Sequence, residues 1–295
     1  MILRNKHVGN LINQRIMKRI KSFDNSHPVL YLIATPIGNL SEFSPRALET
    51  IKEMDLIGAE DTRNTGDLLN KFGIKKSLFS LREHNEIEAS EYLIKQIKEG
   101  KKVAYMSDAG YPGISDPGYL LTKLALENDI AVSVISGPSA FISALVSSGL
   151  DTSHFYFHGF LSPKENEAKT ELEELKDKKE TLIFYESPHR INQTLEVLLE
   201  VLGDRKTSLH RELTKLNEEN IVGHLSELVS LDESTLKGEM VLIIEGNKDN
   251  KSLSKQEIID KVNYFISKNM SKKDAIEVVS EIYGVRKNLI KDLIK

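Results

Sequence analysis

The feature that most constrains this chain is an alternation between short apolar runs and longer amphipathic segments. Helical patterns lie at 44–54, 86–100 and 118–129. The apolar runs, typical of buried β-strands, are VLYLIAT (29–35), MDLIGAE (54–60), SLFSL (77–81), KVAYMS (102–107) and AVSVIS (131–136). Strands that alternate with helices indicate a mainly parallel sheet with helices on both faces, and the lack of polar alternation fits that burial.

A second series of elements follows the segment FYFHGFLSPK (155–164), which we interpret as a domain junction. The series comprises helices at 165–179 and 188–203, strands at 181–187, 207–213 and 238–246, and a short candidate strand at 219–223. The sequence therefore predicts an α/β fold with two α/β domains. Their expected limits are 29–154 and 155–247, flanked by a basic extension at 1–28, a linker at 247–252 and a small helical segment at 253–295.

Composition excludes several classes of protein. The chain has no cysteine, so it has no disulfide, no thiolate nucleophile and no zinc site with cysteine ligands. No apolar run approaches the ~18 residues of a membrane-spanning helix, and residues 1–28 lack the apolar core of a secretory signal. We therefore expect a cytoplasmic protein without a membrane partner.

The charge of the chain is unevenly distributed. The formal net charge is −4, but residues 1–28 carry +5 and residues 251–295 carry +4. Two basic ends on an acidic body suggest contact with a polyanion, although solvated lysine-rich helices are the alternative. The helices predicted near the C-terminus are also spaced as in a helix-turn-helix. This spacing fits either a segment that contacts an RNA backbone or a small helical cap packed on the body of the protein.

Three loops rich in glycine, proline and serine follow three of the predicted strands. They are TPIGNL (35–40), SDAGYPGISDPG (107–118) and SGPSA (136–140). Ligands of parallel sheets bind outside the carboxyl ends of the strands, where glycines let the backbone approach closely. The chain lacks the P-loop pattern and lacks G-x-G-x-x-G after its first strand. The residues thus predict a cleft for a small polar ligand, with ordinary loop chemistry as the alternative.

Six segments in a fixed order carry a more specific signal. They are LYLIATPIGNLSEFSPRALETI, GAEDTRNTGDLL, SDAGYPGISDPGY, ISGPSAFISALVSSGL, TLIFYESPHRI and RELTKLNEENIVGHLSEL. Together they resemble the ribosomal RNA small-subunit methyltransferase I family of the tetrapyrrole methylase superfamily. The resemblance implies two α/β domains of the tetrapyrrole methylase type and S-adenosylmethionine (SAM) as cofactor. It also implies a homodimer that methylates the ribose 2′-OH of a decoding-centre cytidine in the 16S rRNA of the small ribosomal subunit.

The same resemblance assigns a cofactor site to the three loops and to a closing side in the second domain. The residues that it implies are Pro36, Gly38, Asp108, Ala109, Gly110, Ile114, Ser136, Gly137, Ser139 and Ala140, closed by Tyr185, Glu186 and Met240. From its position at a strand exit, Asp108 could accept hydrogen bonds from hydroxyls or an amine. No metal is expected.

The segment YESPHR (185–190) offers groups for proton transfer. Either Glu186 or His189 could accept the proton of a ribose hydroxyl, and Arg190 could pair with a phosphate. The alternative is an ion pair between Glu186 and Arg190 that holds the loop.

Further candidates for contact with RNA lie at other strand ends. Arg63 in EDTR (60–63) could bind phosphate, although Asp61 or Thr62 could simply cap a helix there. His84 in REHNE (82–86) faces the same end, but Arg82 departs from the histidine of the family pattern. Arg211 and Lys215 could also contact RNA, or Arg211 could bridge strands with Glu212.

Two other functions remain open from the sequence. One is a methyltransferase on the same scaffold that acts on a small tetrapyrrole-like molecule. The other is an RNA-binding assembly factor that kept the fold without binding SAM.

Overall fold

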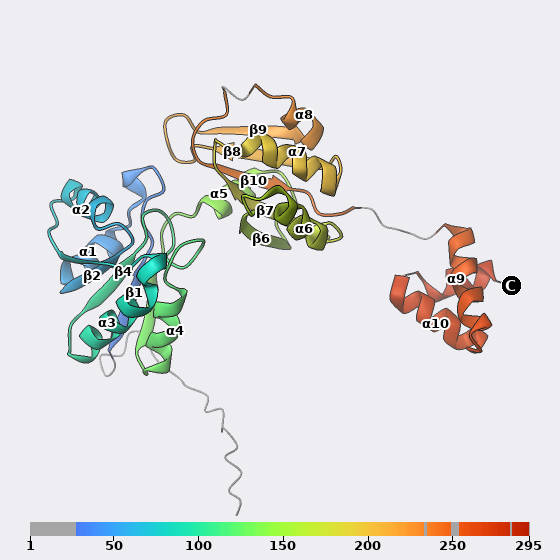
Figure 1. Cartoon of the computed structure of the whole chain (residues 1–295), viewed down its shortest axis with the longest axis horizontal. Coiled ribbons are helices and arrows are strands. Elements are labelled where there is room, and N and C mark those ends of the chain that lie inside the picture. Colours follow the sequence, from blue (N-terminus) through green and yellow to red (C-terminus); the bar gives the residue numbers. More distant parts are fainter. Residues whose placement is uncertain (1–27, 233–234, 249–253, 284, 295) are drawn as a thin grey trace, which may run out of the picture. The chain divides into compact units, whose positions relative to one another are not determined.

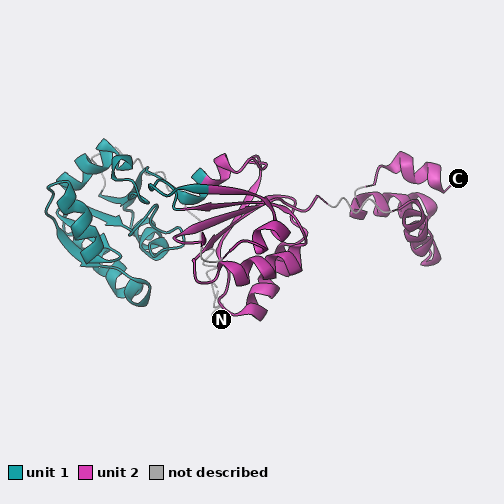
Figure 2. Cartoon of the chain, turned by 90° about the horizontal axis from the view of Figure 1, so that it is seen from above, with its two compact units in different colours: residues 1–143, 212–219 teal, residues 144–211, 220–295 magenta. Residues whose placement is uncertain are grey.

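The computed structural model describes residues 28–232, 235–248, 254–283 and 285–294. Apart from Pro28, the predicted N-terminal extension lies outside the described residues, as does most of the predicted linker. The chain forms two compact units (Figure 2). The first holds the described residues up to Ser143 together with Glu212–Glu219, and the second holds Ala144–Arg211 and the described residues from Asn220 onward.

The first unit is built on a five-stranded sheet with the order β3-β2-β4-β1-β5, in which every paired strand is parallel. This confirms the parallel sheet expected from the alternating pattern (Figure 1). The strands are β1 (Val29–Ile33), β2 (Leu56–Ala59), β3 (Ser77–Ser80), β4 (Val103–Met106) and β5 (Ala131–Ile135). The helices are α1 (Pro45–Glu53), α2 (Thr62–Lys71), α3 (Glu86–Lys98) and α4 (Tyr119–Glu127), with short 3₁₀ turns η1 (Leu40–Glu42) and η2 (Glu83–Asn85). Helix α5 (Ala140–Ser147) begins in the first unit and ends in the second.

Both faces of the first sheet are covered, as strand β4 shows. All four of its residues are buried. Val103 and Tyr105 join a core with residues of α3 and α4, whereas Ala104 and Met106 join a second core with residues of α1 and α2. Because successive side chains of a strand point to opposite faces, a continuous apolar run marks a strand that packs on both sides.

Local residues determine where the helices begin. Ser44 caps α1 by accepting from the backbone N–H of Ala47, and Pro45 occupies the first helical position. Helix α4 follows Gly118, which has no side chain to cap it. Glu86 of α3 caps the helix instead, because its Oε1 accepts from the backbone N–H groups of Leu120 and Gly118 at 3.3 and 2.9 Å.

The second unit contains another five-stranded sheet, with the order β6-β7-β10-β8-β9. Strand β6 is parallel to β7, and β10 is antiparallel to both of its neighbours, so the sheet is mixed. Helices α6, α7 and α8 share a core with it. The elements are β6 (Phe155–Phe160), α6 (Glu165–Leu175), β7 (Thr181–Glu186), α7 (Ile191–Leu202), β8 (Lys206–Arg211), β9 (Glu219–His224), α8 (Leu225–Val229) and β10 (Met240–Ile244).

Strand β6 occupies the first part of 155–164, the segment interpreted from the sequence as a domain junction. The segment begins with a strand at the edge of the second sheet, and its register shifts between Phe157 and Gly159. This irregularity breaks the simple alternation by which a strand is recognised in sequence.

The last three helices pack on one another. They are α9 (Lys255–Ser267), α10 (Lys272–Tyr283) and α11 (Lys287–Leu293). Their common core is made of Ile258, Val262, Ala275, Ile276, Val279, Val285 and Ile290. The helical character predicted for the C-terminal segment is therefore confirmed within 254–294.

Candidate functional site

The three predicted loops converge, because β4, β1 and β5 are adjacent parallel strands. Thr35 and Gly110 form a two-way backbone bridge, with N···O distances of 2.9 and 3.1 Å, that joins the first loop to the second. The phenol of Tyr111 accepts from the backbone N–H of Gly137 at 3.2 Å and joins the second loop to the third. The three turns thus form one connected edge of the sheet.

The long middle loop requires its unusual composition. Gly110, Gly113, Ser115 and Gly118 all have positive φ angles. At Gly118, where φ is +134°, a Cβ would also lie only 3.1 Å from the backbone nitrogen of Gly113. Glycine adopts such angles without the steric cost that other residues incur. The loop is therefore held in one specific path.

A small pocket opens beside the first two loops, within the first unit. Its volume is about 130 Å³. The lining residues come from the first loop, from α2 and from the end of β4, and they are Pro36, Gly38, Leu40, Asn64, Thr65, Leu68, Ser107 and Asp108. Three of them, Pro36, Gly38 and Asp108, belong to the predicted cofactor set.

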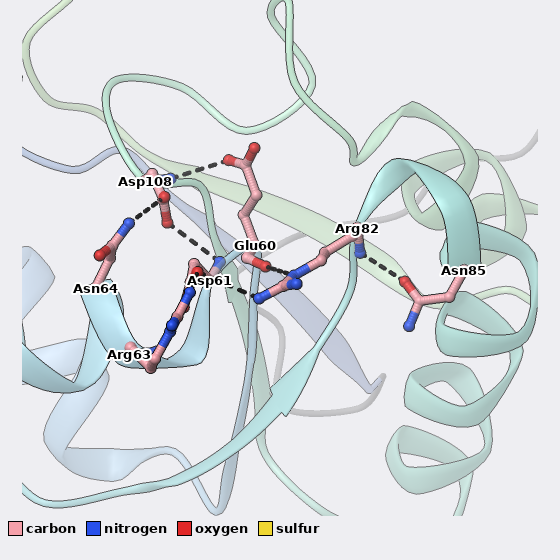
Figure 3. Close-up of polar contacts among 7 residues, drawn as sticks. All are labelled: Glu60, Asp61, Arg63, Asn64, Arg82, Asn85 and Asp108. Atoms are coloured by element: carbon pink, nitrogen blue, oxygen red, sulfur yellow. Dashed lines mark hydrogen bonds and ion pairs between the residues drawn. The ribbon is translucent and has the colours of Figure 1, made fainter.

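Asp108 is the centre of a polar network at this pocket (Figure 3). One carboxylate oxygen accepts from the backbone N–H of Asp61 at 3.2 Å, and the other accepts from the amide of Asn64 at 2.6 Å. The backbone N–H of Asp108 donates to the carboxylate of Glu60 at 3.2 Å. The aspartate is still exposed, so its remaining lone pairs can accept from a ligand.

Asp61 is the N-cap residue of α2, so the helix cap that the sequence offered as an alternative to a binding role at this motif is present. Its carboxylate accepts from the backbone N–H of Arg63 at 2.9 Å and pairs with the guanidinium groups of Arg63 and Arg82 at 2.9 and 3.2 Å. Its hydrogen bonds with Arg63 lower the pKa of Asp61, so it is charged at neutral pH. The side chain of Arg63 is 84% exposed and remains able to bind an anion.

Arg82, the residue that departs from the family pattern, is fixed by its neighbours. Its Nε donates to the carbonyl of Glu60 at 3.0 Å, and its backbone N–H donates to the side-chain oxygen of Asn85 at 2.7 Å (Figure 3). His84 lies in η2 between them and is exposed. The arginine thus braces the end of β3 against the end of β2.

A concentration of carboxylates gives this edge a negative field. Burial, followed by the charges of Glu60 and Asp108, raises the pKa of Asp116 to about 7. Burial is also the main cause of the raised pKa of Glu60. A negative field of this kind favours a cationic or hydroxyl-rich ligand.

Residues 212–219 belong to the first unit and pack against the first loop. A Cβ at Gly38 would lie 2.6 Å from Cγ of Lys215 and 2.9 Å from Oγ1 of Thr214, so only glycine fits there. Oγ1 of Thr214 is buried and has no hydrogen-bond partner among the described residues. Because buried polar atoms are nearly always paired, this hydroxyl is available to a ligand at the first loop.

These features fit SAM, which presents a sulfonium, an amino-carboxylate and a ribose diol. Asp108 can accept from hydroxyl or amine groups, and Thr214 supplies a buried hydroxyl. In the third loop a Cβ at Gly137 would lie 3.0 Å from Cβ of Ala34, which shows how closely the loops approach.

The other predicted cofactor residues of the first unit lie on the same three loops. Gly110 is buried, whereas Ala109, Ile114 and Ser136 are exposed, and Ser139 and Ala140 are half-buried at the start of α5.

In the second unit, Glu186 is buried and fully engaged. Its Oε1 accepts from the backbone N–H of Ser187 at 2.7 Å. Its Oε2 accepts from the hydroxyl of Thr194 at 2.6 Å and pairs with Arg190 at 3.1 Å. The ion pair that the sequence analysis gave as the alternative is present. His189, by contrast, is exposed in the turn before α7.

Three residues from neighbouring strands form one row of the second sheet. Met240 lies opposite Glu186 on one side and opposite Arg211 on the other. The side chain of Met240 is buried in the core shared with the helices. Tyr185 points to the other face, where its ring packs against Phe157 and Phe160 at centroid distances of 5.1 and 5.5 Å.

The sequence analysis did not select two polar residues that lie near Asp108 in the first unit. Asn64 was not selected, although it lies in the quoted motif GAEDTRNTGDLL. Asp116 was also passed over, although it lies in the middle loop. Only the adjacency of β2 and β4 shows that Asn64 reaches Asp108.

Known proteins resemble this chain over most of its length. The model of the Tetrapyrrole (Corrin/Porphyrin) Methylases matches residues 29–229. A protein of Halalkalibacterium halodurans named "Ribosomal RNA small subunit methyltransferase I" is 46% identical over 88% of this chain and 91% of its own length. The chain belongs to this family of methyltransferases. A protein of Escherichia coli O157:H7 with the same name is 42% identical over 93% of this chain and 97% of its own length.

Solved structures support the fold of the family. Uroporphyrin-III-C-methyltransferase from Thermus thermophilus superposes with a TM-score of 0.54 at 19% identity, over 74% of this chain and 94% of its own. The methyltransferase CobJ gives a TM-score of 0.55 at 17% identity, over 75% and 95%. The predicted fold type is thus confirmed. Among the described residues, no helix has the length and apolarity needed to cross a membrane.

Proposed function

We propose that this chain transfers a methyl group from SAM to the ribose 2′-OH of a cytidine in the decoding region of 16S rRNA. In this proposal it acts on the small ribosomal subunit, as a cytoplasmic homodimer. The observation that carries the proposal is the connected edge of three loops around Asp108, in a chain whose relatives are named as small-subunit rRNA methyltransferases.

The first unit would hold the cofactor. Asp108 accepts from hydroxyl or amine groups and the hydroxyl of Thr214 provides a further contact, while Gly38 and Gly137 let neighbouring segments of the protein pack closely against the first and third loops. When bound, SAM supplies an electrophilic methyl carbon on a sulfonium. The remaining task of the protein is to align the ribose oxygen with that carbon, and such positioning contributes several powers of ten in rate.

A ribose hydroxyl is a weak nucleophile, and a base that accepts its proton contributes roughly 10²–10⁴-fold. We assign this role to His189, because its imidazole is exposed. Glu186 makes three hydrogen-bonded contacts and is buried, so it holds the turn that carries His189 and Arg190. With SAM bound, its methyl group would pass to the ribose oxygen and leave S-adenosylhomocysteine, and His189 would accept the proton of the hydroxyl.

Cationic side chains would position the RNA by its phosphates. The side chain of Arg63 is highly exposed, and Arg190, Arg211, Lys215 and His84 are the other candidates named from the sequence. Each of Arg190, Arg211 and Lys215 also contacts its own unit, through the carbonyls of Leu161 and Lys237 and the carboxylate of Glu212.

The test is methyl transfer from isotopically labelled SAM to small ribosomal subunits, followed by digestion and mass spectrometry of the nucleosides. We expect label on the ribose of a cytidine, and label on a base would contradict the proposed position. The same assay with a tetrapyrrole as the methyl acceptor tests the alternative function, a small-molecule methyltransferase, which label on the tetrapyrrole would favour. Absence of SAM binding would favour a non-catalytic assembly factor.

A further inference from the structure

The C-terminal helices α9, α10 and α11 carry a lysine-lined hollow that the methyl-transfer site does not use. The hollow has a volume of about 400 Å³ and is lined by Lys272, Lys273, Ile276, Glu277, Lys287 and Lys291. We call it the lysine groove. The first two lysines open α10, and Lys287 and Lys291 lie four residues apart on α11 and therefore share a face.

The side chains that line the lysine groove carry more positive than negative charge. Glu277 is its single lining carboxylate, and it pairs with Lys287 at 2.5 Å. The hydrogen bond with Lys287 holds the pKa of Glu277 below its usual range, so the carboxylate is charged at neutral pH. Four ammonium groups and one carboxylate thus line the groove, and the carboxylates of Asp274 and Glu281, which act on the Glu277–Lys287 pair from outside the lining, offset part of this positive charge.

Two of the four lysines have structural partners and two do not. The ammonium of Lys272 donates to the carbonyl of Ile294 at 2.8 Å, and Lys287 pairs with Glu277. Lys273 and Lys291 are exposed and make no hydrogen bond or ion pair with any residue that the structure describes. These two cations are free to bind an anion without breaking a contact of the fold.

The lining favours a polyanion over a protein surface. Lysine is depleted in the cores of protein interfaces, which favour aromatic side chains, methionine and arginine, and the residues that line this groove include none of these. Phosphates arrayed along a nucleic acid match flexible ammonium groups, which act as point charges with no strict geometry.

We infer that the lysine groove binds the phosphate backbone of the substrate RNA and raises its affinity without contacting the reacting atoms. This inference rests on the proposed function for the identity of the RNA. The groove would hold the substrate by its charge, while the loops of the first unit determine which atom is methylated.

The test compares two double variants of the full chain that lose equal charge. Lys273→Ala with Lys291→Ala removes the two unpaired lysines of the groove. The matched control is Lys255→Ala with Lys268→Ala, which changes two exposed lysines outside the groove, one at the first position of α9 and one directly after its last residue. Circular dichroism checks that both fold. Affinity for small subunits and for a 16S rRNA fragment is measured at several salt concentrations, together with affinity for S-adenosylhomocysteine.

We expect the groove variant to lose at least ~10-fold in RNA affinity and to reduce the slope of log K against log salt by about two, one for each phosphate contact removed. The control should change affinity by less than about threefold. S-adenosylhomocysteine should bind both variants as it binds the wild type, because neither change touches the loops.

Other outcomes separate this inference from the proposed function. If the wild type methylates subunits and the groove variant keeps its RNA affinity and salt slope, the inference is wrong and the function stands. If the groove variant loses RNA affinity but the wild type transfers no methyl group, the groove stands and the function is wrong. Loss of binding to poly-glutamate with RNA affinity intact would indicate an acidic protein partner and overturn the inference.

Discussion

Replacing Gly137 with alanine tests whether the close approach of the loops matters. A Cβ at this position would lie 3.0 Å from Cβ of Ala34 and 3.2 Å from its carbonyl oxygen. Carbon atoms pack best at about 3.5–4.0 Å, so the third loop or Ala34 must move by roughly a few tenths of an ångström. Ala34 is only 1% exposed and directly follows β1, so it has little freedom to yield.

Overpacking of this kind costs about 1–3 kcal/mol, which corresponds to a fall in Tm of roughly 2–12 °C for a unit of this size. The displaced loop should also bind S-adenosylhomocysteine more weakly, by about 3- to 10-fold, since even a misplacement by about 1 Å costs on the order of 10²-fold in function. Calorimetric titration and thermal unfolding measure the two effects.

Gly66→Ala is the matched control. Gly66 lies inside α2, and its added Cβ would meet Leu78 Cδ1 at an ordinary 3.6 Å. Alanine in a helix interior is favoured over glycine by about 0.5–1 kcal/mol, so this variant should be as stable as the wild type or more stable. If Gly137→Ala matched the control in both Tm and ligand affinity, the reasoning about the loops would be refuted.

Three further changes probe the polar groups. Asp108→Ala should weaken binding of S-adenosylhomocysteine, whereas Arg63→Ala should reduce methylation of RNA and leave that affinity near normal; the reverse pattern would show that the two residues have been assigned to the wrong ligands. Glu186→Gln should lower the free energy of unfolding by about 1–3 kcal/mol in urea, because it weakens a charge-assisted contact with Arg190, and an unchanged midpoint would contradict that role. Because the raised pKa of Asp116 means that the folded state binds its proton more tightly, stability falls as the pH rises from about 4 to about 7. Asp116→Asn removes this loss and should be more stable than the wild type at pH 8, by about 1–2 kcal/mol after solvent screening, with the advantage absent near pH 4; a pH-independent difference would contradict it.

Much of the first unit could be predicted from its sequence. The segments 29–34 and 103–106 are apolar at successive positions with no polar alternation, and β1 and β4 are central strands with cores on both sides. The loop after β4 is rich in glycine because Gly110, Gly113 and Gly118 have positive φ. The spacing of apolar residues and the residues that form turns are local properties, so they can be read from the sequence.

Contacts between distant segments could not be predicted in this way. Asn64 and Asp108 are 44 residues apart, and they meet because β2 and β4 are neighbours in the sheet order. Likewise, nothing local indicates that Thr214 packs against Gly38. Strand order is decided by packing of the whole sheet, so the partners of a site residue become clear only from the fold.

The roles of Glu186 and Met240 show a second limit. The resemblance named both for the closing side of the cofactor site, but the fold buries them on the helix-covered side of the second sheet. Their roles as cofactor contacts stay predictions. A motif identifies a position, whereas the direction of its side chain depends on strand register.

Hydrogen–deuterium exchange with and without S-adenosylhomocysteine tests the cofactor site most directly. The account predicts slower exchange of backbone amides within 35–40, 107–118 and 136–140 together, with no change on the outer helices α3 and α4. Protection confined to a single loop, or found only outside all three, would contradict it.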